Sequence, residues 1–510
     1  MTALPESLYR AGQLRELDRR AIEVAGIPGG ELMERAGRAA FEALGRRWPG
    51  ARRLAVLCGT GNNGGDGYVM ARLARQAGLE VAVLALGDPG RLDGDALRAA
   101  EAWRASGGAT EAFAPEALEA ADVVVDALLG TGLERPVEGA WREAIEAVNR
   151  LGRPVLAVDM PSGLHADTGA VLGAAVRAQI TVSFIGLKQG MFTGEGPEHC
   201  GQVVFDALKV PEEVYRASHP SARRIGPETL ARLLPPRPRT VHKGCCGHVL
   251  VVGGDYGMAG AARMAGEAAA RTGAGLVSVA TRAEHVAVIT GPRPELMCRG
   301  VGGARDLVSL LARADVVAIG PGLGRSPWAA ELLGAVLDSR ATLVVDADGL
   351  NLLAAEPSAR GGWVLTPHPG EAARLLRCTA DEVQADRFAA VEALAEAFGG
   401  VSVLKGAGTL VRAPQGQTCL CDAGNPGMAS GGMGDVLTGA IAGFLAQGLG
   451  LEQAARAGVY AHAVAGDAAA RAGGERGLLA LDLMGPLRTL VNPVAAGDPG
   501  GDGPHGLAGV

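Results

Sequence analysis

The stretch RLAVLCGTGNNGGDGYVMARLARQ (53–76) decides the fold of the first half of the chain. It begins with a continuous apolar run, 53–58, passes through the glycine-rich segment 59–67, and continues as a helical pattern over 67–77. A short apolar run that ends in glycines is typical of a strand buried on both faces. A helix directly after such a strand predicts the start of a βαβ unit in a parallel sheet.

The same alternation of strand and helix continues through the first half. Apolar positions at helical spacing in 14–47 predict one or two opening helices. We expect further strands at 80–86, 121–126, 154–159 and 179–184, and helices at 94–106 and 139–150.

A proline-rich segment then interrupts the pattern. Three prolines fall within PPRPR (235–239), where they remove backbone donors and end regular structure. A second alternation follows it. Its strands are expected at 248–253, 276–280, 315–319, 342–346, 363–366 and 401–404, and its helices at 259–272, 370–377, 384–398, 435–447 and 452–472.

The fold class predicted from these patterns is α/β, with two three-layer domains. We expect a first domain over 1–215, a Pro-rich linker over 216–243 and a second domain over 244–495. The last segment, 496–510, is rich in glycine and proline without periodicity, and we expect it to be disordered.

Composition excludes several classes of protein. The 510 residues include 48% hydrophobic residues, enough for two cores, and carry a formal net charge of −7, which argues against a nucleic-acid or membrane-surface binder. The eight cysteines are scattered without a CxxC pair, and Cys245 and Cys246 are interpreted as bystanders. We expect no signal peptide and no membrane span, hence a soluble cytoplasmic protein.

The glycine-rich segment after the first strand carries the first candidate site. Residues 59–64 satisfy G-x-G-x-x-G, which lets a helix N-terminus hold a phosphate. Asn62, Asn63 and Asp66 add more oxygen atoms than a phosphate loop needs, so a hard cation, a sugar or an amide ring is a further candidate ligand. The structural alternative is a turn of residues that tolerate left-handed backbone.

Two other strand ends carry polar residues. Asp126 ends one predicted strand, and Asp159 ends the next, with Ser162 close behind it. Carboxyl ends of strands in a doubly wound sheet border one crevice, so these side chains and Asn63 are expected to converge. Each aspartate taken alone is equally compatible with a simple cap or loop role.

The second half contains the glycine-rich stretch GNPGMASGGMGDVLTG (424–439), which ends in a predicted helix. Glycines allow the backbone to approach a phosphate, and a helix start stabilises developing negative charge. Asp435 fits a general base that takes a proton from a hydroxyl attacking a terminal phosphate. Its structural alternative is an N-cap. The chain has no GxxxxGK[ST], which excludes a P-loop enzyme.

Three other motifs of the second half are GPGLG (320–324), TPHPGEAARLL (366–376) and LKGAGTL (404–410), the last joining two expected strands. His368 is either a ligand of a substrate amide or phosphate or a structural turn residue. Lys405 is either a partner of nucleotide phosphate or a solvated strand-end lysine.

The first half resembles a known family. GTGNNGGDGYVMARL, VVDALLGTGL and AVDMPSGL look like the NAD(P)H-hydrate epimerase domain, which implies a Rossmann-like fold. The resemblance implies that K⁺ is held by Asn63, Asp126 and Ser162, and that Asp159 is catalytic. The implied ligands of the hydrated nucleotide are Asn62, Asn63, Gly64, Gly65, Asp66, Gly130, Thr131, Gly132, Leu133, Glu134, Arg135, Pro136 and Asp159.

The second half resembles the ADP-dependent NAD(P)H-hydrate dehydratase, a ribokinase-like fold. This resemblance rests on HKGCCGHVLVVGGDYGMAGAA together with the four motifs above, and with the first half it covers roughly residues 10–495. It implies Asp435 at the reacting hydroxyl. The implied substrate ligands are Gly322, His368, Pro369, Gly370, Glu371 and Asp435, and the implied adenine-nucleotide ligands are Lys405, Gly406, Ala407, Gly408, Thr409, Asn425, Gly427, Gly431, Gly432 and Gly434.

The resemblance therefore implies a bifunctional enzyme of nicotinamide nucleotide repair. It would interconvert the R and S forms of hydrated NADH or NADPH and dehydrate the S form at the expense of ADP, giving AMP and phosphate. Mg²⁺ is expected on the phosphates, and the chain is expected to be a homo-oligomer. Two alternatives stay open: a plain small-molecule kinase in the second half, and a non-catalytic binding module in the first.

Overall fold

The computed structural model describes residues 4–492 and divides into two compact units. The first unit runs to Arg224 and includes the short stretches Asp381–Ala389 and Gly406–Gly408. The second unit holds the remaining described residues from Ile225 onward. The segment 496–510, which we expect to be disordered, lies outside the described residues.

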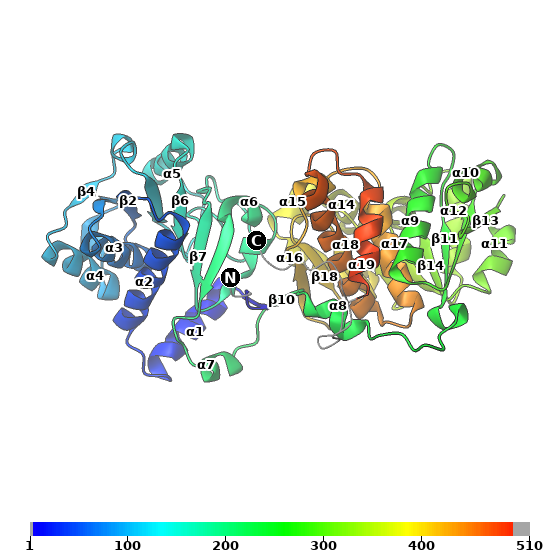
Figure 1. Cartoon of the computed structure of the whole chain (residues 1–510), viewed down its shortest axis with the longest axis horizontal. Coiled ribbons are helices and arrows are strands. Elements are labelled where there is room, and N and C mark those ends of the chain that lie inside the picture. Colours follow the sequence, from blue (N-terminus) through cyan, green and yellow to red (C-terminus); the bar gives the residue numbers. More distant parts are fainter. Residues whose placement is uncertain (1–3, 493–510) are drawn as a thin grey trace. The chain divides into compact units, whose positions relative to one another are not determined.

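The first unit is built on a seven-stranded sheet whose neighbouring strands all pair in parallel. The strands, in spatial order, are β4 (Thr110–Ala112), β3 (Glu80–Ala85), β2 (Arg53–Cys58), β5 (Val123–Ala127), β6 (Val155–Val158), β7 (Ile180–Phe184) and β9 (Gln202–Asp206). Helices cover both faces: α2 (Gly29–Arg47), α3 (Asn62–Gln76) and α4 (Gly94–Ala105) belong to one hydrophobic core, and α5 (Gly139–Leu151) belongs to the other (Figure 1). This confirms the predicted three-layer α/β class for this half.

The strand order of this sheet reverses between β2 and β5, which is where doubly wound sheets bind ligands. The backbones that leave these two strands touch. A Cβ atom on Gly59 would lie 1.9 Å from the carbonyl oxygen of Leu128, so only glycine fits at this position.

Helix α3 begins at Asn62, five residues earlier than the sequence pattern predicts. The segment that looked like a loop is therefore largely the first turns of the helix. Its glycines serve close packing: Cβ atoms would lie 2.1 Å from the Gly59 oxygen at Gly64 and 2.6 Å from Met33 at Gly65. None of the glycines in 59–67 has a positive φ, so the alternative of a left-handed turn is wrong.

The N-terminal segment completes the first unit. Strand β1 (Ser7–Tyr9) pairs in parallel with β8 (Leu187–Lys188) and antiparallel with β10 (Ala222–Arg224). Helix α1 (Ala11–Glu23) follows β1 and buries Leu14, Leu17 and Ala21 on one face. The two short helices of this unit are α6 (Gly196–Cys200) and α7 (Glu212–Arg216).

The second unit contains a sheet that is parallel from β13 to β17 and antiparallel beyond it. Its strands, in spatial order, are β13 (Met297–Gly300), β12 (Leu276–Thr281), β11 (His248–Val252), β14 (Val316–Ile319), β15 (Thr342–Val345), β16 (Trp363–Leu365), β17 (Val401–Leu404), β18 (Thr409–Arg412) and β19 (Thr418–Cys421). The order reverses between β11 and β14, as it does between β2 and β5 in the first sheet.

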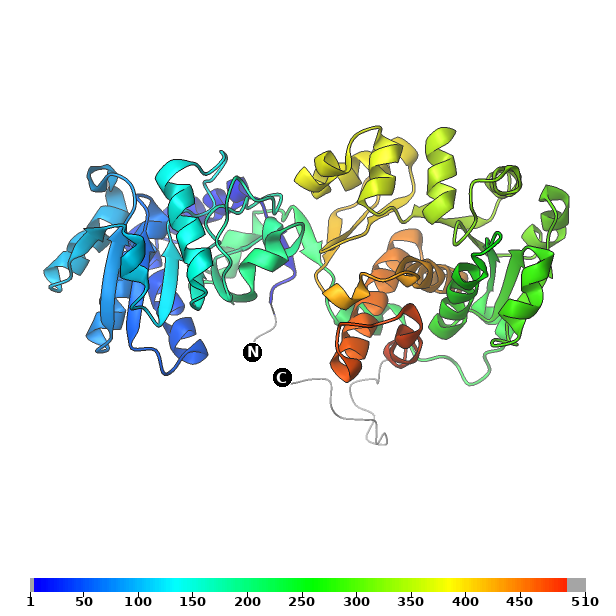
Figure 2. The ribbon, with the colours of Figure 1, turned by 90° about the horizontal axis from the view of Figure 1, so that it is seen from above.

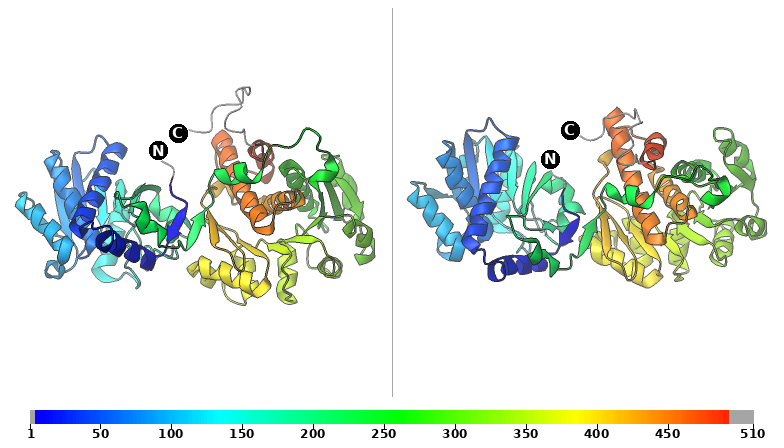
Figure 3. Two further views of the ribbon diagram at one scale, coloured as in Figure 1. Left: turned by 90° about the horizontal axis from the view of Figure 1, so that it is seen from below. Right: turned by 60° about the horizontal axis from the view of Figure 1, so that its bottom comes forward.

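Helices cover both faces of this second sheet (Figures 2 and 3). One face carries the main core with α9 (Ala259–Thr272), α17 (Met433–Ala446), α18 (Leu451–Gly473) and α19 (Met484–Leu490). The other helices of the unit are α8 (Glu228–Leu233), α10 (Val286–Thr290), α11 (Ala304–Leu311), α12 (Pro327–Leu337), α13 (Ala347–Ala355), α14 (Pro369–Leu376), α15 (Ala380–Ala385) and α16 (Arg387–Phe398).

Helix α17 packs very closely on α9. A Cβ atom on Gly439 would lie 2.0 Å from the carbonyl oxygen of Ala265, and one on Gly443 would lie 2.7 Å from that of Ala269. Glycine at both positions lets the two backbones touch, which fixes the place where α17 begins.

Several elements differ from the sequence prediction. The single helix expected at 384–398 is two helices, α15 and α16, and the sequence patterns did not predict α12 or α13. The range 216–243 contains the short elements β10 and α8. Among the described residues, no helix is both long and apolar enough to cross a membrane.

Candidate active sites

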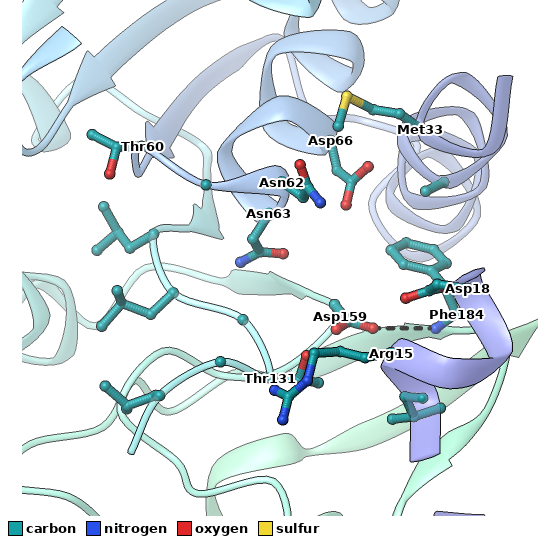
Figure 4. Close-up of a pocket in the computed structure, with 18 of the residues that line it drawn as sticks. Arg15, Asp18, Met33, Thr60, Asn62, Asn63, Asp66, Thr131, Asp159 and Phe184 are labelled. Atoms are coloured by element: carbon teal, nitrogen blue, oxygen red, sulfur yellow. Dashed lines mark hydrogen bonds between the residues drawn. The ribbon is translucent and has the colours of Figure 1, made fainter. Parts of the chain in front are cut away.

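A cavity of about 1070 Å³ opens at the switch point of the first sheet (Figure 4). The first turn of α3 contributes Asn62, Asn63 and Asp66 to its wall, and the loop after β5 contributes Gly130–Pro136. Asp159, at the end of β6, lies between them. The structure thus brings together most of the residues expected to bind the substrate of the first half. Gly64 and Gly65 instead lie in the packing described above.

Asp159 is paired with a buried lysine. Lys188 Nζ forms an ion pair with the Asp159 carboxylate and lies 2.9 Å from Ser183 Oγ, and its residue is only 1% exposed. Phe184 N donates to Asp159 Oδ1 over 3.4 Å. Asp159 itself has φ 64°, a left-handed conformation that side chains rarely adopt. Strain of this kind persists where surrounding structure enforces it, which is common at functional sites.

Two more carboxyl groups point into the same cavity. Asp66 comes from α3 and Asp18 from α1, and Figure 4 shows both side chains directed toward the space around Asp159. Burial, together with the charges of Asp159 and Asp18, raises the pKa of Asp66 well above its usual value. Burial and the Asp159 charge raise the pKa of Asp18 to about 6. Arg15, also from α1, adds a cation to this wall.

A second polar cluster lies behind the cavity, where Ser162 and Asp126 meet. Ser162 donates to the two Asp126 carboxylate oxygens, from Oγ over 2.6 Å and from N over 2.7 Å. Ser162 Oγ also accepts from Leu129 N at 2.8 Å. Burial raises the pKa of Asp126 to about 6.

Asn63 lies next to that cluster. A Cβ atom on Gly130, the residue after Leu129, would be 3.4 Å from Asn63 Cβ. Both polar atoms of the buried Asn63 amide lack a hydrogen-bond partner within the protein. A buried unpaired amide is unfavourable, so its oxygen is positioned for an external ligand. Asn63 and Ser162 therefore both lie against the loop after β5, and Ser162 pairs with Asp126. Asp159, which the sequence predicts beside them, is paired with Lys188 instead.

The second candidate site lies at the carboxyl ends of β15, β16 and β17 in the second unit. Lys405, after β17, places its Nζ 2.6 Å from Asp346 Oδ1 and 3.9 Å from Glu371 Oε2. Thr438, on α17, donates to Asp346 Oδ2 over 2.9 Å. Burial opposes the charge of Lys405, but the surrounding carboxylates of Asp346, Glu371 and Asp435 raise its pKa overall.

Asp435 lies in the first turn of α17 beside this ion pair. The N-cap of α17 is Gly432, whose φ is 93°, so the alternative of Asp435 as the N-cap is wrong. Burial and the Asp346 charge raise the pKa of Asp435 to about 7, although Lys405 opposes the shift. A carboxyl with a pKa near neutrality is suited to general base catalysis at that pH.

His368 and Glu371 form a reciprocal cap at the start of α14. His368 Nδ1 accepts from Gly370 N at 3.0 Å, and Glu371 Oε2 accepts from His368 N at 2.9 Å. His368 therefore has a structural role as the N-cap of α14, and Pro369 is the first residue of that helix. Burial raises the pKa of Glu371 to about 7, and burial lowers the pKa of His368.

One glycine of the stretch 424–439, at the start of α17, lies next to Lys405. A Cβ atom on Gly434 would lie 3.3 Å from Lys405 Nζ, so the start of α17 and the loop after β17 are adjacent. Asn425 Nδ2 donates to Asp467 Oδ1 over 2.9 Å, which anchors the beginning of the same stretch to α18. Gly322 has φ 59° and accepts from Asp255 N over 2.7 Å, near the end of β14.

Sequence reasoning missed several charged residues of the two sites, among them Lys188, Asp18, Arg15 and Asp346. Two of these four carried a signal. Lys188 interrupts the apolar run ITVSFIGLKQGMF (180–192), and Asp346 ends the strand TLVVD, as Asp126 and Asp159 end theirs. Asp18 and Arg15 lie on an ordinary amphipathic helix, and only the fold shows which of its polar positions face the cavity.

Two sheets with parallel cores, each with a carboxylate–lysine pair at the carboxyl edge, are typical of a two-domain α/β enzyme with two active sites. The sequence comparisons agree. The family model described as NAD(P)H-hydrate dehydratase matches residues 249–487, and the YjeF-related protein N-terminus matches residues 29–190. The chain belongs to the family of bifunctional NAD(P)H-hydrate repair enzymes.

Relatives of this family match along nearly the whole chain. The chain is 54% identical over 486 residues to the bifunctional NAD(P)H-hydrate repair enzyme Nnr of Coxiella burnetii, covering 95% of this chain and 99% of that one. It is 46% identical to the Escherichia coli enzyme of the same name, covering 96% and 95%. These matches confirm the predicted class, a bifunctional enzyme with an epimerase half and an ADP-dependent dehydratase half.

The chain also resembles solved structures, of which one has a sequence identity and TM-score that bear on the fold of the second half. A ribokinase-like superfamily protein of Enterococcus faecalis is 30% identical with a TM-score of 0.50, and the match covers 54% of this chain and 96% of that protein. This likeness agrees with the predicted ribokinase-like fold of the second half.

Proposed function

We propose that the second site removes the C6 hydroxyl of hydrated NADH or NADPH by phosphorylating it first. The observation that carries this proposal is the position of Asp435, half a turn into α17 and beside Lys405. Asp435 takes the proton of the substrate hydroxyl while the oxygen of that hydroxyl attacks the β-phosphorus of ADP, and AMP leaves. The lone pair of the ring nitrogen then expels phosphate, and loss of a C5 proton restores the dihydropyridine ring.

The positive groups around Asp435 stabilise the charge that develops on the transferred phosphoryl group. The N-terminus of α17 presents unpaired N–H groups and the positive end of its dipole. Lys405 adds an ammonium group, and its ion pair with Asp346 at 2.6 Å holds it in position. The loops that we assign to the adenine nucleotide are Lys405–Thr409 and Asn425–Gly434, with His368–Glu371 and Gly322 on the side of the hydrate.

The side chains of this site fit Mg²⁺ only as a companion of the nucleotide. The described residues contain no group of three or more His, Cys, Asp or Glu able to hold a metal by themselves. Mg²⁺ is normally bound by substrate phosphates, waters and one or two carboxylates, and Asp346 and Glu371 supply those carboxylates. The ion would neutralise phosphate charge during the transfer.

For the first half, we propose that Asp159 is an acid/base group of the epimerase, close to the hemiaminal carbon of the substrate. The pair with Lys188 holds the Asp159 carboxylate in position within the cavity. The hydrated nucleotide would occupy the cavity between Asn62–Asp66 and Gly130–Pro136. This assignment supports catalysis in the first half rather than a mere binding module.

K⁺ fits the neighbouring cluster. The unpaired Asn63 amide oxygen, Ser162 Oγ and the Asp126 carboxylate form an all-oxygen donor set, which hard cations prefer. K⁺ bound there would order the loop after β5, because Asn63 and Ser162 both contact that loop. In the cell, we place the enzyme in the cytoplasm as a homo-oligomer.

The decisive experiment uses separated epimers of NADPH hydrate with ADP, Mg²⁺ and K⁺. The return of dihydronicotinamide absorbance is followed from each epimer. We expect recovery from the S epimer, and from the R epimer with a lag set by epimerisation. Recovery from S alone would reduce the first half to a binding module. A stable phosphorylated product without recovery would indicate a plain kinase.

A further inference from the structure

Two acidic walls face each other across the cavity of the first unit. Asp159 and its partner Lys188 come from the ends of β6 and β8, whereas Asp66 comes from α3 (Figure 4). Lys188 is already committed to Asp159 and Ser183. The family comparisons and the proposal above give Asp66 no chemical role, and Asp18 from α1 no role at all.

The chemistry of epimerisation asks for two proton-transfer groups. The C6 carbon carries a hydroxyl and is bonded to the ring nitrogen N1, so it is a hemiaminal. Inversion without breaking the C–H bond can proceed by opening the C6–N1 bond, rotating the resulting aldehyde and closing the ring on its other face. Opening requires a base for the hydroxyl proton and an acid for N1.

We propose that Asp66 is the proton donor to N1 and that it acts opposite Asp159, with Asp18 as a positioning residue in the same cavity. In ring opening, Asp159 takes the hydroxyl proton, the O–H electrons form the C=O bond, and the C6–N1 electrons accept the Asp66 proton. Ring closure runs both transfers backward. Atoms and charge balance, and the enzyme returns to its starting protonation state. This inference rests on the proposed epimerase function.

The surroundings of Asp66 are rich in carboxyl groups. Asp18, Asp66 and Asp159 line one cavity, and the lysine of that cavity, Lys188, is paired with Asp159. Like-charged carboxyl groups in one cavity do not all ionise together. Arg15, Arg91 and Asp95 are the other charged groups on the α1 and α4 sides of this cavity.

Asp18 is assigned as a positioning residue because it acts through Asp66. It lies on α1, whose buried face is fixed by Leu14 and Leu17. Its charge makes release of the Asp66 proton harder, and it contributes directly to the raised pKa of Asp66. Removing the Asp18 charge should therefore leave Asp66 in place but let it lose its proton at lower pH.

The test measures R-to-S conversion from pH 5 to 9 in the full chain, with separated epimers and K⁺. We expect D66N to lower kcat about 100-fold or more with little change in KM, because an amide cannot donate the proton at N1. We expect D18N to retain activity at low pH and to shift the alkaline limb of the pH profile downward by about one pH unit, and D18E to restore it.

E16Q is the matched control, because Glu16 lies on α1 and pairs with solvent-exposed Arg19. Thermal unfolding of each variant and an unchanged KM for the R epimer report that its first unit is folded. An unchanged D66N rate, or an unchanged D18N pH profile, would overturn the proposal while the epimerase function stands. If D159N also epimerises normally, the proposed role of Asp159 fails as well, whereas the proposed epimerase function fails only if the wild-type chain does not interconvert the epimers.

Isotope labelling separates ring opening from loss and readdition of water. In H₂¹⁸O, ring opening retains the original C6 oxygen, so incorporation should stay well below one atom per inversion. Incorporation of one solvent oxygen at every inversion would overturn proton delivery to N1, because the C–O bond would then be the one that breaks.

Discussion

The two halves of this chain use one sheet order but build their sites at different strands. In the first sheet the site lies at the switch point, around β2, β5 and β6, where the backbones of Gly59 and Leu128 touch. In the second sheet the carboxylate–lysine pair lies farther along, at β15 and β17, under the start of α17. In both sheets the site lies at the carboxyl edge, and the local glycines and helices determine which strand ends form it.

The charges around the two lysines differ as well. Lys188 is enclosed and pairs with one carboxylate, whereas Lys405 lies among Asp346, Glu371 and Asp435. An enclosed pair holds one carboxylate in a fixed position. A lysine among several carboxylates leaves some of them with a pKa near 7, which is what a base that must accept a proton requires.

The largest effect that separates the two sites is expected from D435N. The amide cannot accept the hydroxyl proton, so dehydration of the S epimer should fall by about 100-fold to 10,000-fold. Interconversion of the epimers should proceed at the normal rate in the same protein. The two activities are measured separately, by absorbance with ADP and by chromatography of the epimers without it. A fully active variant would refute the assignment of Asp435 as the base.

Replacing the lysine of each site in turn tests the comparison further. K405M should reduce dehydration about 100-fold, because the phosphoryl charge loses its ammonium partner and Asp346 loses its ion pair. K188M should instead reduce epimerisation, because Asp159 loses its ion pair. Each variant is assayed for both reactions. Loss of both activities in either variant would indicate a folding defect and is checked by thermal unfolding.

Much of this contrast could be read from the sequence, and some could not. The Asp159 and Asp435 positions follow from apolar strands and glycine patterns that run along the chain. Asp346 also ends an apolar strand, TLVVD. It does not stand out in the sequence, because no glycine-rich loop follows that strand. The position of Asp18 in the cavity could not be predicted from the sequence, because it depends on how α1 packs against elements more than a hundred residues away along the chain.

The glycine-rich segment 59–67 shows a second limit. Its composition suggests a loop, yet the structure uses most of it as the start of α3. Glycine weakens an isolated helix, so local propensity argues against this outcome. Tertiary packing decides otherwise, because side chains at Gly64 and Gly65 would collide with Gly59 and Met33.

K⁺ dependence should be confined to the first site. N63A removes the unpaired amide oxygen, and we expect the K⁺ concentration for half-maximal epimerisation to rise about 10-fold or more. Dehydration of the S epimer should keep its own dependence on cations unchanged. Titration with KCl at constant ionic strength, balanced with a larger organic cation, measures both. Equal responses of the two reactions would contradict this site.

The smallest effect concerns stability and pH. Asp435 has a pKa of about 7 in the folded protein and about 4 in an unfolded chain. Between these values the folded state binds the extra proton, so its contribution to stability is present at low pH and is lost as pH rises to 7. D435N lacks this dependence. The melting temperature of D435N relative to the wild type should therefore increase from pH 5 to pH 8, and a constant difference would refute the raised pKa.

The left-handed backbone at Asp159 has a consequence for selection by stability. Glycine adopts φ 64° without strain, so D159G would relieve a local conformational penalty of about 1 kcal/mol while it removes the carboxylate and leaves Lys188 unpaired. Pairing with Lys188 is what makes aspartate tolerable at this point. The double change D159G/K188M would remove the backbone strain without leaving a buried lysine unpaired. A laboratory screen for heat resistance alone would therefore favour a first half that has lost its activity.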